Sequence, residues 1–316
     1  MLATSFFPYT AFASKLAPTA TFPISQDSSE TGPALIKSLD CNGKTLDLSR
    51  PQVMGVLNVT PDSFSDGGDF FSIDTAVEQA QRMVEGGAAI IDIGGESTRP
   101  GAGPVPAAEE LRRVLPVIEA LQATIPVPIS IDTRKPDVMR AAVDAGAGLI
   151  NDVYALQAEG AMTVAAELGV PVCLMHMQGL PETMQESPDY TDVVGEVADF
   201  LVARADACSA AGIPAARILV DPGFGFGKTV EHNLQLLRHL DRLVSRGYPV
   251  LVGLSRKSLI GKVLDLPVDN RLYPGIALAV LAVWQGAAVI RCHDVQETVE
   301  AVRMCQAVRT AGDNSG

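Results

Sequence analysis

The sequence predicts an α/β fold, a (β/α)8 TIM barrel with a flexible N-terminal extension. From residue 51 onward, eight short apolar runs alternate with helix-like segments. Each run is apolar at consecutive positions, which is typical of parallel strands covered by helices on both faces of a sheet. Polar residues end every run, as at the mouth of a barrel. Eight successive strand-helix units favour closure into a ring.

The first 38 residues differ in composition from the rest of the chain. Thr, Ser, Pro, Ala and Phe dominate them, no acidic residue precedes Asp27, and no apolar period is visible. We therefore expect residues 1–38 to be a flexible extension and residues 39–316 to form the barrel domain. The extension has neither the basic start of a secretory signal nor the arginines of a transit peptide. A start codon placed too far upstream is the alternative explanation.

The elements follow in order along the chain. The predicted strands cover residues 52–58, 89–95, 128–132, 148–153, 171–177, 217–223, 249–255 and 288–294. The predicted helices cover residues 74–85, 107–123, 136–145, 161–168, 193–211, 230–246, 271–285 and 295–308. An open doubly wound sheet is the alternative fold. It is disfavoured because no GxGxxG follows the first strand, and because Pro222 stands where a phosphate-binding loop at 223–229 would need its first glycine.

Residues 272–290 carry no charge and are long enough to span a bilayer. Gly286, however, separates a helix-like Ala/Leu stretch from a strand-like run, so a buried helix, a turn and a buried strand explain the segment better.

The composition excludes several classes of function. The chain has 37 acidic and 24 basic residues and a net charge of −13, so no general basic face exists to bind nucleic acid. The five cysteines are odd in number, widely spread and without a CxxC pair, which fits neither a disulfide framework nor a zinc cage. They indicate a reducing compartment, and we expect a cytoplasmic protein.

Polar residues at the ends of parallel barrel strands converge on one face, although they lie far apart in sequence. The predicted strand ends carry Asn58, Asp92 with Glu96, Asp132, Asn151 with Asp152, His176, Asp221, Ser255 with Arg256 and Lys257, and Arg291 with His293. Asp132, Asn151, Asp221 and Lys257 would suit a flat heterocycle with amino and oxo groups. A salt bridge between Asp221 and Lys257 without any ligand is the alternative.

Arg291 and His293 follow the last strand, where barrels of this kind often bind phosphate. A buried polar cluster that closes the barrel is the alternative there. Two loops rich in Gly, Pro and Ser, at 58–71 and 94–106, indicate lids over the same face. Thr98 and Arg99 favour this reading over surface loops without a role. The chain has no HExxH and no GxSxG, which argues against zinc hydrolysis and serine nucleophiles.

Eight ordered motifs resemble the dihydropteroate synthases, the folate-pathway enzymes that sulfonamides target. They occupy residues 53–68, 90–102, 130–136, 149–153, 172–179, 219–228, 252–258 and 290–295, within a resemblance that covers about 45–310. The resemblance implies the same barrel and a transferase that joins 6-hydroxymethyl-7,8-dihydropterin diphosphate to 4-aminobenzoate. Small-molecule substrates, Mg2+ and a homodimer are implied with it.

The resemblance also implies roles for particular residues. Asp132, Asp221, Lys257 and Arg291 would be the catalytic residues. The pterin would contact Asp132, Asn151, Asp221 and Lys257, with Val153, Met175 and Phe226 as apolar walls. The diphosphate would contact Asn58, Arg291 and His293, and Asn58 would also hold magnesium. The 4-aminobenzoate would lie near Phe64, Thr98, Arg99, Pro100, Phe226 and Ser258.

Two other functions remain open at this point. A pterin-binding methyltransferase that serves a corrinoid shares the barrel, but it has no use for the Arg291 and His293 pair. An inactive homologue that binds pterin without catalysis is the second alternative. Residues 271–280 also depart from the small, serine-containing sequence more usual in the family, which affects packing and none of the site residues.

Overall fold

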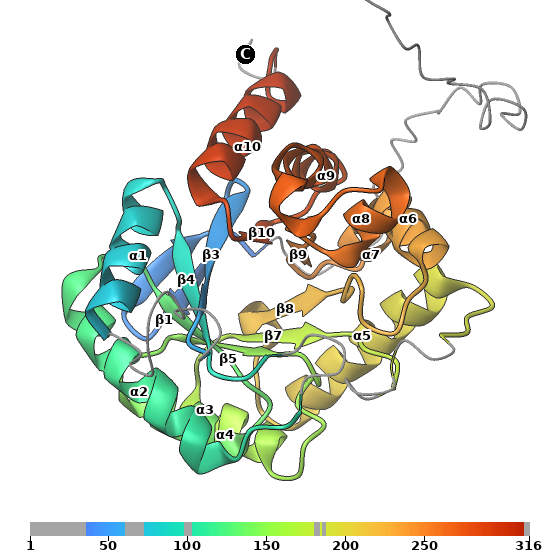
Figure 1. The fold of residues 1–316 in the computed structure, drawn as a ribbon. Coiled ribbons are helices and arrows are strands. Elements are labelled where there is room, and N and C mark those ends of the chain that lie inside the picture. The colour runs from blue at the N-terminus through green and yellow to red at the C-terminus, as the bar shows by residue number, and fades with distance from the viewer. Residues whose placement is uncertain (1–35, 61–72, 98–102, 180–183, 185–187, 313–316) are drawn as a thin grey trace, which may run out of the picture. The chain divides into compact units, whose positions relative to one another are not determined.

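Eight parallel strands form a ring around a central axis (Figure 1). The structure is a computed structural model that describes residues 36–60, 73–97, 103–179, 184 and 188–312. The strands follow one another in the order β8-β7-β6-β5-β4-β3-β10-β9. A parallel bridge between Val220 and Val250 joins β8 to β9, and the Val220 amide donates to the Pro249 carbonyl over 3.0 Å. The predicted barrel is confirmed.

The barrel strands are short and follow the predicted runs. They are β3 (Gln52–Asn58), β4 (Ile90–Gly94), β5 (Ile129–Asp132), β6 (Leu149–Asp152), β7 (Val172–Met175), β8 (Ile218–Asp221), β9 (Leu251–Gly253) and β10 (Val289–Cys292). The helices are α1 (Ile73–Glu85), α2 (Ala107–Thr124), α3 (Pro136–Asp144), α4 (Ala161–Leu168), α5 (Val193–Ala210), α6 (Val230–Arg238), α7 (Leu240–Val244), α8 (Ser258–Leu264), α9 (Leu272–Trp284) and α10 (Val295–Arg309).

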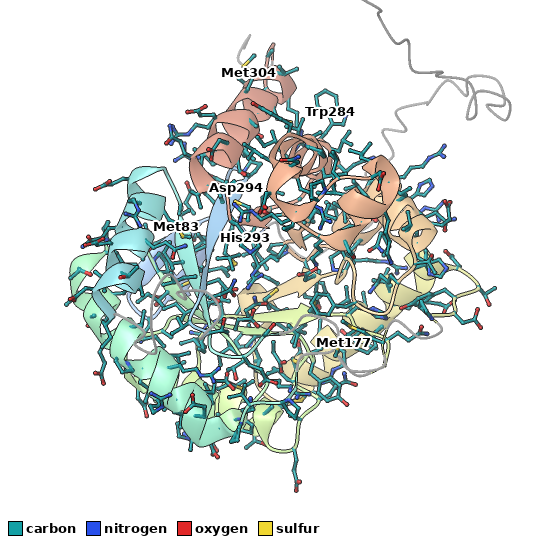
Figure 2. All side chains as sticks on the ribbon, in the orientation of Figure 1. Met83, Met177, Trp284, His293, Asp294 and Met304 are labelled. Carbon is teal, nitrogen blue, oxygen red and sulfur yellow. The ribbon has the colours of Figure 1, made fainter. Side chains whose placement is uncertain are left out.

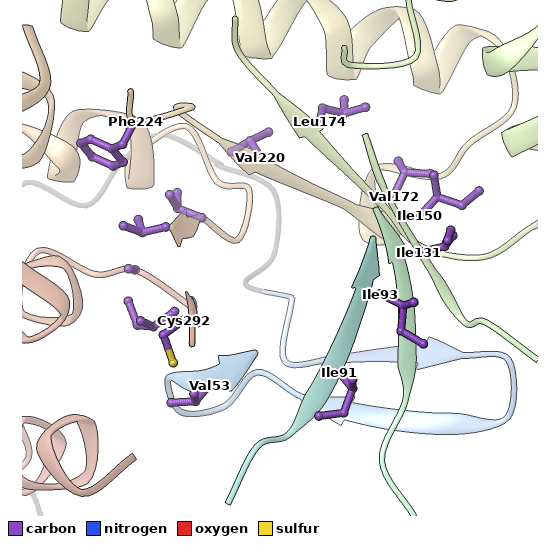
Figure 3. Close-up of a cluster of buried hydrophobic side chains, with 14 of the residues drawn as sticks. Val53, Ile91, Ile93, Ile131, Ile150, Val172, Leu174, Val220, Phe224 and Cys292 are labelled. Atoms are coloured by element: carbon purple, nitrogen blue, oxygen red, sulfur yellow. The ribbon is translucent and has the colours of Figure 1, made fainter. Parts of the chain in front are cut away.

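The outer faces of the strands pack against the surrounding helices (Figure 3). Ile91 and Ile93 on β4 both belong to this outer core and are fully buried. Successive strand residues point to opposite faces, so Asp92 between them points into the barrel. Its hydrogen bonds to residues of β6 and β10 agree with that direction. The same alternation places polar side chains inside the barrel on several strands.

A hairpin closes the barrel at the amino-terminal ends of the strands. It consists of β1 (Ser38–Cys41) and β2 (Lys44–Asp47), joined by Asn42 and Gly43 in positive-φ conformations of 56° and 83°. Leu39, Cys41 and Leu46 of the hairpin pack against inward-facing residues at the starts of the barrel strands. Those residues are Met54, Ile90, Leu149, Cys173, Leu219, Leu251 and Val289. This apolar layer is the floor of the barrel, and the polar residues lie above it.

Some predicted elements were wrong in detail. The helix expected over residues 230–246 is two helices, because His239 has φ −116° and ψ 30° and interrupts the turn between α6 and α7. The hairpin and α8 were not predicted. The uncharged segment 272–290 is α9, a turn and the start of β10, as expected. Across the described ranges, we find no helix with both the length and the apolar character that crossing a membrane requires.

Candidate active site

Several of the polar residues predicted at the strand ends come together at one mouth of the barrel, whereas Asp152 accepts from the backbone of its own loop and Glu96 pairs with Lys135. Strand pairing places Asn58 beside Gly94, Gly94 beside Asp132, and Asp132 beside Asn151, across four neighbouring strands. A Cβ built on Gly94 would lie 3.8 Å from Asp132 Oδ2 and 3.9 Å from Asn58 Oδ1. The glycine therefore leaves a gap between these two oxygens, at the entrance to the barrel.

Arg291 binds two inward-facing aspartates, and one of them also binds Asn151. Its Nε donates to Asp92 Oδ2 over 2.6 Å, and its Nη2 donates to Asp132 Oδ2 over 2.7 Å. Asn151 Nδ2 donates to the same Asp92 oxygen over 3.1 Å. A guanidinium forms such paired, charge-assisted bonds in a fixed plane, so the two aspartates determine its orientation.

Asp92 and Asp132 differ in exposure. Asp92 is fully buried, and its Oδ1 accepts no hydrogen bond from the described residues. The Asp132 side chain retains 12% exposure and faces the mouth. Burial raises the pKa of Asp132 to about 7, although Arg291 opposes the rise. Asp92 therefore anchors Arg291 from below, and Asp132 presents a carboxyl group that titrates near neutral pH.

Asp221 ends β8, and Lys257 follows β9, the strand next to it. Gly223 N donates to Asp221 Oδ1 over 2.7 Å, while Lys257 Nζ donates to the carbonyl of Phe224. Burial raises the pKa of Asp221 and lowers that of Lys257 to about 8, and each residue's charge opposes the other's shift. Within the described part of the chain no salt bridge joins the two side chains. The salt-bridge alternative is therefore wrong, and both groups keep hydrogen-bonding capacity for a ligand.

An apolar cluster lies next to these polar groups. Val153, Met175, Met177 and Met184 form it, with Tyr154 and Phe226 packed against them. The Phe226 ring also lies 4.7 Å from Lys257 Nζ, measured to the ring centroid. Three predicted apolar wall residues thus occur in one cluster beside the polar set, as a flat heterocycle would require.

A second group of donors follows β9 and β10. His293 donates through its backbone amide to Ser255 Oγ over 3.2 Å, and its Nδ1 lies 3.1 Å from the same oxygen. Arg256 forms an ion pair with Asp294, directly before α10 begins. Figure 2 labels Asp294 and His293 at this end of the strands. These contacts hold the loops after β9 and β10 together, so His293 and Arg291 belong to one side of the mouth.

Comparisons with known proteins agree with this geometry. The family model described as pterin binding enzyme matches residues 54–293. The dihydropteroate synthase of Escherichia coli K12 is 52% identical over 276 residues, which is 87% of this chain and 98% of that protein. This chain belongs to the dihydropteroate synthase family.

Solved structures of the dihydropteroate synthase family have the same fold. That of the Xanthomonas albilineans enzyme with 4-aminobenzoic acid is 54% identical and superposes with a TM-score of 0.82, covering 86% of this chain and 98% of that one. The same enzyme in complex with 7,8-dihydropteroate is 50% identical, with a TM-score of 0.79 and the same two coverages. The barrel of this chain is therefore that of a dihydropteroate synthase.

Four residues predicted from the family resemblance lie outside the described residues. They are Phe64, Thr98, Arg99 and Pro100, and they include the residues expected in the two lids. Ser258 is described and is the exposed first residue of α8, directly after Lys257. Of the predicted 4-aminobenzoate contacts, Phe226 thus packs against Lys257 Nζ, and Ser258 follows Lys257 in the sequence.

Sequence reasoning missed three contributors to this site. Asp92 was recognised as a strand-end residue but given no role, although its position between two isoleucines indicates an inward direction. Lys228 was also missed; it is 2% exposed and donates to the loop that carries Phe226. The third is a partly buried ion-pair cluster in which Lys135 contacts both the fully buried Glu110 and Glu96, at the start of the loop after β4.

Proposed function

We propose that this chain condenses 6-hydroxymethyl-7,8-dihydropterin diphosphate with 4-aminobenzoate, giving 7,8-dihydropteroate and diphosphate in folate biosynthesis. One observation supports the proposal most strongly. Asp132, Asn151, Asp221 and Lys257 face one mouth beside an apolar cluster, in a chain that belongs to the dihydropteroate synthase family. Such a set offers both donors and acceptors in a half-apolar site, as a pterin ring requires.

In this reaction the carbon-oxygen bond to diphosphate breaks and a carbon-nitrogen bond to the aniline forms. The aniline nitrogen then loses one proton. We propose that Arg291 and His293 stabilise the charge that develops on the departing diphosphate. Asp132 and Asp221 would stabilise positive charge on the pterin side, and Lys257 would hold the ring by hydrogen bonding. No strong base is required, because an aniline that has formed the new bond is acidic.

We propose that Asn58 contributes one ligand to a magnesium ion that arrives with the diphosphate. The donor set fits this role, since an amide oxygen is a hard ligand and magnesium commonly keeps waters and phosphate oxygens as its other ligands. Among the described residues no group of three His, Cys, Asp or Glu side chains could hold a metal. Bound magnesium would neutralise charge on the leaving group.

We also propose that the protein works as a homodimer in the cytoplasm. Leu281 and Trp284 on α9 and Met304 and Val308 on α10 are each more than half exposed, on two helices that pack together (Figure 2). A patch of this kind favours an interface. The five cysteines are all free and buried, which suits a reducing compartment.

The experiment is an activity assay with matched lysine variants. Purified protein with magnesium, the pterin diphosphate and labelled 4-aminobenzoate is expected to form labelled dihydropteroate. Lys257→Ala and Arg291→Ala should each lose on the order of 100-fold in kcat/KM. Lys262→Ala, which removes an exposed lysine five residues further along, should retain activity. Well-folded wild type that forms no product would instead indicate an inactive homologue.

A further inference from the structure

The loop after β8 carries two residues of the proposed pterin site, Asp221 at its start and Phe226 near its end. It has no regular secondary structure between β8 and α6. Gly223 and Gly227 have positive φ angles of 66° and 62°. A Cβ on Gly223 would collide with the carbonyl of His176, and one on Gly227 would collide with that of Gln178. The loop therefore lies directly against the segment that follows β7.

Lys228 ends this loop and folds back beneath it. Its Nζ donates to the carbonyls of Gly223 and Phe226, each over 3.0 Å, and lies 2.9 Å from Nδ1 of His176. The His176 carbonyl is a fourth acceptor, 3.3 Å from Nζ, so the three protons of an ammonium group would be shared among four acceptors. One side chain thus connects both ends of the loop to the residue after the neighbouring strand.

This arrangement places a nearly fully buried amino group between the segments that follow β7 and β8. Lys228 is 2% exposed, and none of its hydrogen bonds goes to a carboxylate. Burial lowers the pKa of Lys228 well below its usual value, while the charge of Asp221 opposes that shift. Burying a cation costs free energy that an apolar residue of similar length would avoid. An apolar residue could not donate the hydrogen bonds that Lys228 forms with the loop carbonyls.

His176 is itself held in place. Its backbone amide donates to the Asp221 carbonyl over 2.9 Å, and its ring meets the Phe200 ring edge-on at 4.9 Å between centroids. Burial, with the nearby Lys228 charge, lowers the pKa of His176 to about 3, so the neutral ring can accept from Lys228 through Nδ1. Tyr190 adds a further restraint, because its hydroxyl donates to the Gly227 carbonyl over 2.8 Å.

Lys257, in the segment between β9 and α8, contacts the same loop through the Phe224 carbonyl and the face of the Phe226 ring. The two lysines thus bind different carbonyls of one loop: Lys228 those of Gly223 and Phe226, and Lys257 that of Phe224. We propose that Lys228, together with His176, is a positioning residue of the pterin subsite. By fixing the loop after β8, it holds Phe226 and Lys257 in the positions in which both can contact the pterin ring. This inference rests on the proposed function, since it assumes that the loop contacts a pterin.

The test measures binding of the pterin diphosphate alone by calorimetry, and steady-state kinetics, on paired variants. Lys228→Met keeps the length of the side chain and removes its donors. We expect its Kd and KM for the pterin diphosphate to rise about tenfold, with kcat per folded molecule changed less than about threefold. The surface variant Lys262→Met should match wild type in all three quantities.

A second pair covers the case in which Lys228→Met does not fold. His176→Asn retains an acceptor near the position of Nδ1 and is expected to bind the pterin within about threefold of wild type, whereas His176→Leu should bind about tenfold more weakly. The inference is overturned if Lys228→Met binds the pterin diphosphate with the wild-type Kd. It is also overturned if both His176 variants do so. If wild type itself fails to bind the pterin diphosphate, the proposed function fails and not the role of Lys228 alone.

Discussion

Arg291 Nη2 donates to Asp132 Oδ2 over 2.7 Å, although 159 positions separate the two residues in the sequence. The same guanidinium is held from the other side by the buried Asp92. Arg291 is therefore oriented before any ligand binds. A diphosphate group would bind a guanidinium that two carboxylates already hold in one orientation. Less free energy is then spent on orienting Arg291 during the reaction.

Removing Arg291 should reduce both stability and activity. Arg291→Ala would leave the fully buried Asp92 carboxyl group without its ion-pair partner, so we expect a loss of about 3 kcal/mol in the free energy of unfolding. Chemical denaturation measures this. Arg140→Ala is the control, because the Arg140–Glu167 pair is about half exposed and should contribute less than about 1 kcal/mol. Equal losses for the two variants would contradict the anchoring role of Asp92.

The pH profile of kcat/KM should be bell-shaped. Burial raises the pKa of Asp132 to about 7 and lowers that of Lys257 to about 8. If the pterin needs the carboxylate and the ammonium together, kcat/KM rises with pH through about 7 and falls through about 8. Asp132→Asn should remove the acidic limb, and Lys257→Arg the basic limb. A wild-type profile that is flat between pH 6 and 9 would exclude these two roles.

Stability should also depend on pH through Asp132. Its folded pKa of about 7 lies above its usual value of 3.8, so between these pH values the folded protein binds more protons than the unfolded chain. The contribution of this group to the free energy of unfolding therefore falls as pH rises through that window. Thermal unfolding of Asp132→Asn at a series of pH values should show a shallower decline than wild type; an identical slope would refute the shift.

Gly148→Ala should destabilise the barrel without changing its kinetics. A Cβ at Gly148 would collide with the carbonyl of Cys41, in the backbone of the hairpin that forms the floor. We expect a loss of about 1–3 kcal/mol, measured by denaturation, with KM values unchanged. Gly275→Ala is the matched control. Nothing lies within 4 Å of a Cβ at that helical position, so the change should stabilise α9 by about 0.5–1 kcal/mol.

The proposed homodimer predicts a monomeric variant. Trp284 is 55% exposed and Met304 is 66% exposed, on the neighbouring helices α9 and α10. The double change of Trp284→Arg and Met304→Arg would place two charges in the proposed interface, and sedimentation should then give the mass of one chain. Wild type should give the mass of two chains. A wild type that sediments as one chain at micromolar concentration would exclude the dimer.

Much of the fold could be predicted because the barrel strands are apolar on both faces. That pattern also marks where each run becomes polar, so Asp132, Asn151, Asp221, Lys257 and Arg291 were identified as residues of one mouth. Their hydrogen-bond partners could not be predicted. Whether Lys257 contacts Asp221 or the Phe224 carbonyl depends on loop geometry, which no periodicity encodes.

The elements that were missed have separate physical reasons. The strands of the hairpin have four residues each, which is too short for a periodic signal, although Asn42-Gly43 is a recognised turn sequence that could have indicated it. The break at His239 interrupts an amphipathic pattern without any glycine or proline. Lys228 follows a glycine-rich loop, and a lysine at such a position is ordinarily solvated; its burial follows from the folding of the loop over it.

The floor formed by Leu39, Cys41 and Leu46 limits how small molecules reach and leave the barrel. Because these side chains close the far end of the barrel, whatever enters at the mouth must also depart there. A molecule bound against Asp132 and Asn151 would then be covered by a second reactant that enters through the same mouth. We expect the reactant that lies deeper to bind first and the product to leave through the same mouth.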